Sequence, residues 1–187
     1  MRWILLTIVL MSITFCGVRD LMLLTDKHAK TFWDWMPGES SNQLSHLAPE
    51  LRSELEWVMG ALEREGFRVE VVTTWRSPLR QKLLYRYGLL RHWAGLGKAS
   101  VAGPSSSCHS RNDAQGRPHS LAVDLRLADT TPLKYHAQFF HRLGHFATQR
   151  GLIWGGHWRQ TNSTWRSFGL GWDPGHIEHS GCRLTHH

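Results

Sequence analysis

The chain has 187 residues, of which 41% are hydrophobic and 20% are charged. This length suits one domain with an appendage, and a core of this size can bury most of its apolar surface without disulfides. The 22 Lys and Arg residues outnumber the 15 Asp and Glu residues, and the net charge of +7 favours an anionic partner. Because the basic residues are scattered in ones and twos and form no recognisable nucleic-acid motif, we expect no binding to DNA or RNA.

The N-terminus is apolar. Residues Trp3 to Val18 are interrupted only by Thr and Ser, follow Met1-Arg2 and end at Arg19-Asp20. The run is shorter than the roughly 20 residues of a spanning helix, although Leu21 to Leu24 could extend it. We assign residues 1–25 to a signal peptide or an uncleaved membrane anchor, a buried helix being the less favoured interpretation. Either assignment places the rest of the chain in the periplasm or outside the cell.

A polar stretch separates this segment from the first helix. Residues 26–45 include Pro37-Gly38 and predict a linker, so the folded domain is expected to span residues 46–183. Pro49 suits the first position of a helix that ends before Gly66. The apolar residues of this helix recur at helical spacing and are Leu51, Leu55, Val58, Met59 and Leu62.

The next segment predicts a strand and a second helix. Arg68 to Thr74 alternates in polarity and is rich in Val and Thr, as strands are. Ser77-Pro78 opens a helix that runs to about Tyr87, so Arg76 stands at the end of the strand. Its guanidinium suits a carboxylate or a developing oxyanion. Gly88 to Ser107 is Gly-rich and lacks sustained periodicity, which predicts a loop.

The C-terminal half predicts two strands around a helix. Leu121 to Leu127 alternates and would carry Asp124 on a strand. Thr131-Pro132 opens a helix that stops at Gly151. Two His residues four apart on it, His141 and His145, lack the intervening Glu of an H-E-x-x-H zinc motif and are expected to be solvated. Residues 172–179 predict a returning strand.

Three residues offer the donor set of a catalytic zinc site. His109, Asp124 and His176 supply two imidazoles and one carboxylate, which leaves a fourth position for water. Asp173 lies three residues before His176, close enough along the chain to serve as a general base. A chain with 13 His residues places some of them near Asp by chance, so the residues around them decide the assignment.

These surroundings resemble one enzyme family. Ser107-x-His109, a polar insertion and Leu121-Ala122-Val123-Asp124-Leu125 resemble the first zinc motif of the D-alanyl-D-alanine carboxypeptidase and L-alanyl-D-glutamate endopeptidase family. Gly151 to Trp158, followed by Asp173-x-x-His176-x-Glu178, is similar to its second half. Val72 to Tyr85 is similar to its entry strand and helix. The three ordered blocks are far more specific than any single motif.

The resemblance implies an α+β fold of the Hedgehog/DD-peptidase type, with a small antiparallel sheet flanked by helices. It implies a bacterial or phage, endolysin-like zinc peptidase that cleaves peptidoglycan stem peptides as a D,D-carboxypeptidase or an L-alanyl-D-glutamate endopeptidase. The implied Zn²⁺ ligands are His109, Asp124 and His176. The implied general base is Asp173, and Arg76 would bind the substrate. We expect a monomer. The alternative is a zinc-containing cell-wall-binding module without catalysis.

The chain departs from the family pattern in one place. In the compact form of the family the ligand His and the ligand Asp lie seven residues apart, whereas the insertion after His109 is longer. His119 therefore competes with His109 as the first ligand, and the Ser-x-His context favours His109. Glu178 shares the face of His176 on the predicted strand, where it could bind a ligand imidazole, contact substrate or be a surface carboxylate.

The three Cys residues cannot all pair with one another. Cys16 lies in the apolar N-terminal segment, while Cys108 and Cys182 each lie close in sequence to a proposed zinc ligand. In an oxidising compartment we slightly favour a disulfide between these two. A zinc thiolate from Cys108 and two inert buried thiols are the alternatives.

Overall fold

The computed structural model describes residues 36–94, 102–128, 132–158 and 165–184. The expected N-terminal segment, residues 1–25, and the first half of the expected linker, residues 26–35, lie outside these ranges. Among the described residues, no helix combines the length and apolar character needed to cross a membrane. The described residues form two compact units, a larger one within residues 40–77 and 106–184 and a smaller one within residues 36–39, 78–94 and 102–105.

The larger unit is built on an antiparallel sheet with the strand order β2-β4-β6-β5. Its strands are β2 (Val69–Thr73), β4 (Ala122–Leu127), β5 (Ile153–Trp154) and β6 (His176–Glu178). A second, small sheet pairs β1 (Ser40–Ser41) with β3 (Trp75–Arg76). The expected α+β class with a small antiparallel sheet flanked by helices is confirmed. Because β1 is paired, the folded unit includes the last residues of the stretch assigned to a linker.

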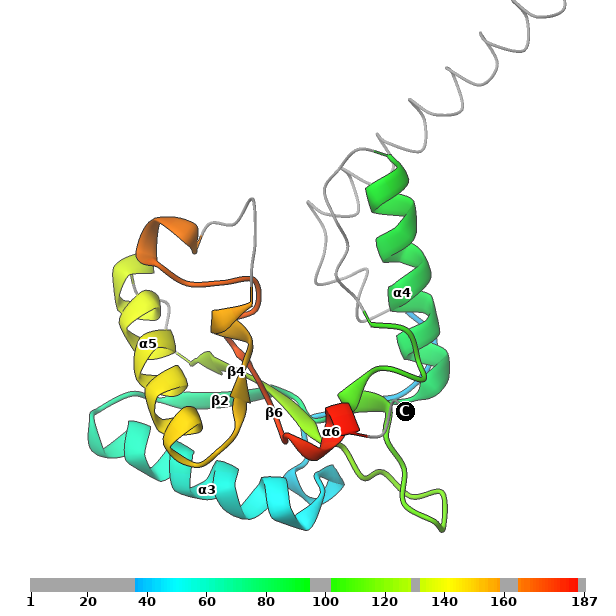
Figure 1. The fold of residues 1–187 in the computed structure, drawn as a ribbon, viewed down its shortest axis with the longest axis horizontal. Helices are drawn as coiled ribbons and strands as arrows, with labels where there is room; N and C mark the ends of the chain where they lie inside the picture. The colour runs from blue at the N-terminus through cyan, green and yellow to red at the C-terminus, as the bar shows by residue number, and fades with distance from the viewer. Residues whose placement is uncertain (1–35, 95–101, 129–131, 159–164, 185–187) are drawn as a thin grey trace, which may run out of the picture. The chain divides into compact units, whose positions relative to one another are not determined.

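Two long helices accompany this sheet, as the apolar periodicity predicted (Figure 1). They are α3 (Pro49–Arg64) and α5 (Leu133–Gln149), and each is followed by a glycine with positive φ, Gly66 at 87° and Gly151 at 70°. A residue with a Cβ would be strained in that left-handed conformation, which is why glycine occupies the position where each helix ends. Shorter helical segments are η1 (Leu44–His46), η2 (Cys108–Ser110), η3 (Gly155–His157), η4 (Arg166–Phe168) and α6 (Gly181–Leu184).

The two faces of the sheet have different neighbours. Alternate residues of a strand point to opposite faces, and on β4 this separates core residues from site residues. Val123, Leu125 and Leu127 are buried in the hydrophobic core, together with Ile177 of β6 and the apolar faces of α3 and α5. Asp124 has the opposite parity. One face of the sheet therefore stabilises the fold, and the other is available for chemistry.

In the smaller unit, α4 (Pro78–Trp93) is longer than predicted. The sequence pattern ended this helix near Tyr87 and made Gly88 the start of a loop, which is wrong. A single glycine inside a helix costs only about 1 kcal/mol relative to Ala, and the following residues, Leu89 and Leu90, favour helix. Within this unit the buried Gln81 donates from Nε2 to the carbonyl oxygen of Ala102 at 2.7 Å.

Trp154 on β5 packs between two glycines. A Cβ at Gly144 of α5 would lie 2.3 Å from one part of the indole ring, and a Cβ at Gly156 of η3 would lie 2.1 Å from another. The indole Nε1 donates to the carbonyl oxygen of Pro174 at 2.8 Å. Trp154 thus joins α5 to the turn that precedes His176, and any larger residue at either glycine would displace the ring.

We expect Gly144→Ala to lower the free energy of unfolding by about 1–3 kcal/mol, because the added methyl group overpacks against Trp154. The matched control is Gly60→Ala in α3, where the nearest atom to a new Cβ is Nη1 of Arg64 at 3.5 Å. That change should be neutral or stabilising by up to about 1 kcal/mol, since Ala favours helix over Gly. Urea denaturation of both variants checks this, and equal effects would contradict the packing of Trp154.

Candidate metal centre

The pairing of β4 with β6 brings two of the proposed ligands together. Asp124 and His176 are directly opposite each other in the antiparallel ladder. Their side chains leave the sheet on the same face, and Nδ1 of His176 lies 2.9 Å from Oδ1 of Asp124. His176 is buried, with 6% of its surface exposed, so this contact lies largely out of solvent.

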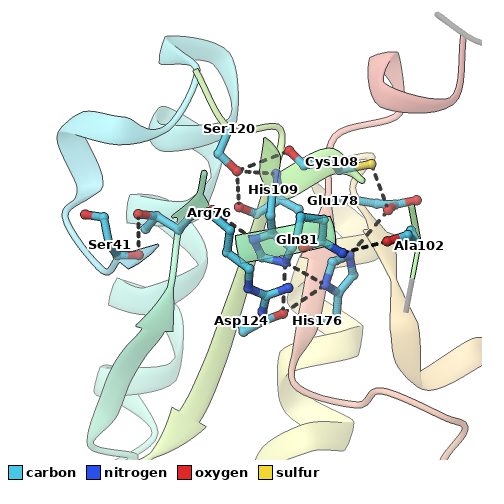
Figure 2. Close-up of polar contacts among 12 residues, drawn as sticks. Ser41, Arg76, Gln81, Ala102, Cys108, His109, Ser120, Asp124, His176 and Glu178 are labelled. Atoms are coloured by element: carbon cyan, nitrogen blue, oxygen red, sulfur yellow. Dashed lines mark hydrogen bonds and ion pairs between the residues drawn. The ribbon is translucent and has the colours of Figure 1, made fainter. Parts of the chain in front are cut away.

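His109 reaches the same point from η2, outside the sheet. The turn is held by the carbonyl oxygen of Cys108, which accepts hydrogen bonds from the backbone of Leu121 at 3.0 Å and from Oγ of Ser120 at 3.2 Å. Nε2 of His109 lies 3.2 Å from Oδ1 of Asp124 and 3.4 Å from Nδ1 of His176. The three donor atoms lie within 4.8 Å of one another, and Figure 2 shows the side chains pointing toward a common centre.

The long insertion after His109 closes on itself. Asn112 and Pro118 form an antiparallel bridge, and Oδ1 of Asp113 accepts hydrogen bonds from two backbone N–H groups of the turn. His119 sits on the returning arm, where its backbone N–H donates to the carbonyl oxygen of Arg111 at 2.9 Å. Of the two candidates, the structure brings His109 into the cluster, and His119 is not part of it.

In each imidazole, the nitrogen that points away from Asp124 faces a hydrogen-bond acceptor; we call it the outer nitrogen. Nδ1 of His109 lies 2.8 Å from the carbonyl oxygen of Thr74, and Nε2 of His176 lies 3.3 Å from Oε2 of Glu178. A carbonyl or carboxylate only accepts, so these nitrogens carry hydrogen and donate. The inner nitrogens, Nε2 of His109 and Nδ1 of His176, are therefore the ones that can offer a lone pair to a metal. Two imidazoles in these tautomers and one carboxylate fit Zn²⁺.

The carbonyl of Thr74 is itself fixed by the small sheet. The backbone N–H of Thr74 donates to the carbonyl oxygen of Ser41 at 2.7 Å, and its hydroxyl donates to the carbonyl oxygens of Ser41 and Gln43 at 3.0 Å each. Thr74 is completely buried. The orientation of His109 therefore depends on β1, a segment that carries no chemistry.

Arg76 points at the cluster from β3. One of its guanidinium nitrogens, Nη2, pairs with Oδ2 of Asp124, which leaves Oδ1 facing the two imidazoles. Burial alone would raise the pKa of Asp124, but its interactions with His109, Arg76 and His176 hold it well below its usual value. Asp124 therefore stays ionised, as a metal ligand must.

The pKa values of the two imidazoles are shifted in opposite directions. Burial lowers the pKa of His109, so this ring is neutral near neutral pH. Burial would also lower the pKa of His176, but hydrogen bonds to Asp124 and Glu178 together raise it to about 9. Without metal, His176 is therefore protonated on both nitrogens and neutralises part of the carboxylate charge around it.

Asp173 lies just before the turn that leads into β6. The strand that the sequence predicted over residues 172–179 comprises only His176–Glu178. The carbonyl oxygen of Asp173 accepts from the backbone N–H of His176 at 3.0 Å, and a Cβ at Gly155 would lie 2.3 Å from that oxygen. Burial and the negative charge of Asp124 raise the pKa of Asp173 to about 6. Its carboxylate therefore experiences the charge of Asp124, is ionised at neutral pH and is more basic than an ordinary Asp.

The two candidate cysteines are joined. Cys108 and Cys182 form a disulfide, with a Cα–Cα distance of 5.8 Å, and both are buried next to Ala122 of β4. The slightly favoured expectation is confirmed, and the sulfur of Cys108 is not a metal ligand here. Glu178, for which three roles were open, is 4% exposed and contacts His176, so it is not a surface carboxylate.

Two features of the site escaped sequence reasoning. The carbonyl of Thr74 left no signal, because any residue has one. The ring of Trp158 lies 5.0 Å from the ring of His176, measured between centroids, and is partly exposed. Trp158 belongs to the Trp-Gly-Gly-x-Trp run, so the family resemblance could have marked it. His141 instead lies 2.8 Å from the carbonyl oxygen of Phe168, away from the cluster.

No protein-family model and no curated protein matches this chain. Solved structures resemble it at low identity. One is the LD-carboxypeptidase LdcB, described for its peptidoglycan recognition, with 17% identity, a TM-score of 0.44, and coverage of 73% of this chain and 61% of that protein. The match therefore spans less than two thirds of LdcB.

Two further neighbours are structures of the vancomycin-resistance D,D-pentapeptidase VanY. A mutant in complex with Zn(II) has 14% identity and a TM-score of 0.48, and covers 80% of this chain and 83% of that protein. VanYB in complex with D-alanine-D-alanine has 14% identity and a TM-score of 0.47, with coverage of 80% and 81%. These neighbours are peptidases. The function proposed below rests on the geometry of the site.

We expect His109→Ala to lose bound zinc and His119→Ala to keep it, because only the first removes a donor atom from the cluster. Metal content per chain, measured by mass spectrometry after dialysis, distinguishes the two. The assignment of the first ligand is wrong if zinc survives in His109→Ala and is lost in His119→Ala.

Zinc binding should release about one proton near neutral pH. The pKa of His176 is raised to about 9, so below that pH the metal must displace the proton on Nδ1. We therefore expect the affinity for zinc to rise about tenfold per pH unit until the pH reaches this value. Calorimetry in buffers of different ionisation enthalpy measures the released protons, and a buffer-independent enthalpy would contradict the prediction.

Proposed function

We propose that this protein is a zinc-dependent peptidoglycan peptidase that hydrolyses stem-peptide bonds, as a D,D-carboxypeptidase or an L-alanyl-D-glutamate endopeptidase. The observation that supports it most is the convergence of Nε2 of His109, Oδ1 of Asp124 and Nδ1 of His176, with Asp173 close to them. Three protein ligands with an open fourth position are typical of catalytic zinc sites, whereas structural sites have four protein ligands. The stem-peptide substrate follows from the resemblance of the motifs.

The residues His109, Asp124 and His176 would hold the metal. Bound zinc supplies Lewis-acid chemistry, which makes water a stronger acid and polarises a carbonyl group. The protein contributes the fixed tautomers of the two imidazoles and a carboxylate that stays ionised. Because these groups are held by the fold before the metal arrives, little reorganisation is needed on binding.

In this mechanism Asp173 moves the proton. Its carboxylate accepts a proton from the attacking water and delivers it to the nitrogen of the leaving amine. A general base works best when its pKa approaches the working pH while the group remains ionised. Burial and the charge of Asp124 raise the pKa of Asp173 to about 6, which is closer to neutral pH than that of an ordinary Asp and leaves the group ionised there.

We assign Arg76 a role at the substrate in addition to its contact with Asp124. Its side chain is 20% exposed and stands beside the ligand cluster. A guanidinium can donate to the carboxylate of a peptide terminus or to the oxygen that becomes negative during hydrolysis. Arg76 would thus pair with two anions, the carboxylate of Asp124 and a negatively charged oxygen of the substrate.

The location that we propose is the periplasm or the exterior, with the N-terminal segment as signal peptide or anchor. The Cys108–Cys182 disulfide supports an oxidising compartment, because reducing systems keep cytosolic thiols reduced. The net charge of +7 supports an encounter with anionic cell-wall polymer.

Asp173→Asn separates an enzyme from a binding module. The amide keeps the size of the side chain, so the variant should fold, hold zinc and bind peptidoglycan fragments, while hydrolysis falls on the order of 10²- to 10⁴-fold. Mass spectrometry of digested peptidoglycan measures the products. Asp113→Asn, in the insertion, is the matched control and should cleave at the rate of the unmodified protein.

Two outcomes would count against the proposal. Cleavage by Asp173→Asn at the full rate would mean that Asp173 is not the base. If the zinc-loaded protein binds stem peptide but cleaves none, the alternative of a non-catalytic zinc-containing wall-binding module is the better description.

A further inference from the structure

One oxygen atom connects the metal ligands to the disulfide. Oε2 of Glu178 lies 3.3 Å from Nε2 of His176 and also 3.3 Å from Sγ of Cys108. Glu178 is 4% exposed and His176 is 6% exposed, so both contacts are shielded from solvent. In the disulfide the sulfur carries no hydrogen, and of these two neighbours only His176 can donate to Oε2.

The disulfide also joins the two segments that carry the imidazoles. Cys108 directly precedes His109 in η2, and Cys182 lies in α6, shortly after His176 and Glu178 of β6. The bridge spans 74 residues of sequence. η2 is not a strand of the sheet, so its distance from β6 is set by a few hydrogen bonds and by this covalent link.

We propose that Glu178 is the positioning residue for His176, that the Cys108–Cys182 disulfide holds Glu178 and His109 in place, and that the affinity of the site for metal therefore depends on the redox state of this cysteine pair. The inference rests on the proposed function, since it concerns the same metal site. It adds a dependence of metal affinity on the redox state of the cysteines, which neither the motifs nor the donor set implies.

Reduction would affect both the contact of Glu178 with His176 and the covalent link between Cys108 and Cys182. The disulfide takes up two electrons and two protons and becomes two thiols, while a phosphine reductant becomes a phosphine oxide whose oxygen comes from water. The sulfur of Cys108, which lies 3.3 Å from Oε2 in the disulfide form, then carries a hydrogen and can compete with Nε2 of His176 for the same acceptor. The covalent link between η2 and α6, the helix that follows β6, is lost as well. Both imidazoles become less well fixed, and metal affinity falls.

The first experiment tests Glu178 with the disulfide intact. Glu178→Gln keeps the side-chain volume but replaces the charged acceptor, and it should weaken Co²⁺ and Zn²⁺ binding about 10- to 100-fold, the usual effect of removing such an outer partner. At saturating Co²⁺ the visible absorption of the bound metal should also change, which a loss of stability alone would not cause. The matched control is Glu70→Gln, whose carboxylate pairs with Arg126 on the surface and is 43% exposed.

The second experiment tests the cysteine pair. The full-length protein is titrated with Co²⁺ before and after treatment with a phosphine, which, unlike a dithiol, does not compete strongly for the metal, and free thiols are counted in both samples. We expect about tenfold weaker binding after reduction. The Cys108→Ala/Cys182→Ala variant should bind weakly from the start and should not respond to the phosphine. Circular dichroism confirms that each variant is folded.

The outcomes separate this inference from the proposed function. If the oxidised, unmodified protein binds neither Co²⁺ nor Zn²⁺, the proposed zinc enzyme is wrong. If it binds metal, and folded Glu178→Gln and the double cysteine variant bind as tightly with the same Co²⁺ spectrum, only the inference is overturned.

Discussion

The antiparallel pairing of β4 with β6 is the constraint on which the rest of the structure depends. It sets Asp124 opposite His176 and, with the same register, Val123 opposite Ile177. Because side chains alternate, a slip of one residue would move the ligands into the core and the core residues into the site. The apolar face packed against α3 and α5 therefore specifies the register that the metal site requires. Stability and chemistry depend on the same hydrogen-bond ladder.

The site concentrates charge in a buried place, and its groups compensate one another. Asp124 lies between the guanidinium of Arg76 and two imidazoles, and Glu178 contacts protonated His176. Burial of such groups is costly unless they are paired and hydrogen-bonded. A dication bound at the proposed site would take over the neutralising role of the proton on His176, and its binding would therefore be coupled to proton release.

The orientation of the site comes from parts of the chain that carry no chemistry. The carbonyl of Thr74, held by β1, sets the ring of His109, and the disulfide ties η2 to the chain that follows β6. Trp154, confined between two glycines, fixes the turn that leads to His176. The first two supports act on the segment that carries His109, and the third acts on the turn before His176. Ligands supported in this way keep their geometry without the metal, as preorganised sites must.

The sequence by itself determined the elements whose residues repeat with a clear period, namely α3, α5, β2 and β4, because burial of one face imposes that period. It also named His109, Asp124 and His176, which the structure brings together, since ligand chemistry restricts the residue types and the motifs restrict their positions. The extent of α4 was missed, because a lone glycine weakens a helix without ending it. The short β6 was overestimated, because propensity sets strand ends poorly.

Only the tertiary structure decided the contacts between residues far apart in sequence. It selected His109 over His119 through the closed insertion, joined Cys108 to Cys182, and turned Arg76 toward Asp124. It also gave Glu178 a partner. These outcomes depend on distances across the sheet and on which nitrogen of an imidazole faces an acceptor. Periodicity and motif spacing act along the chain, whereas these contacts exist only once the chain has folded and the surrounding groups have been buried together.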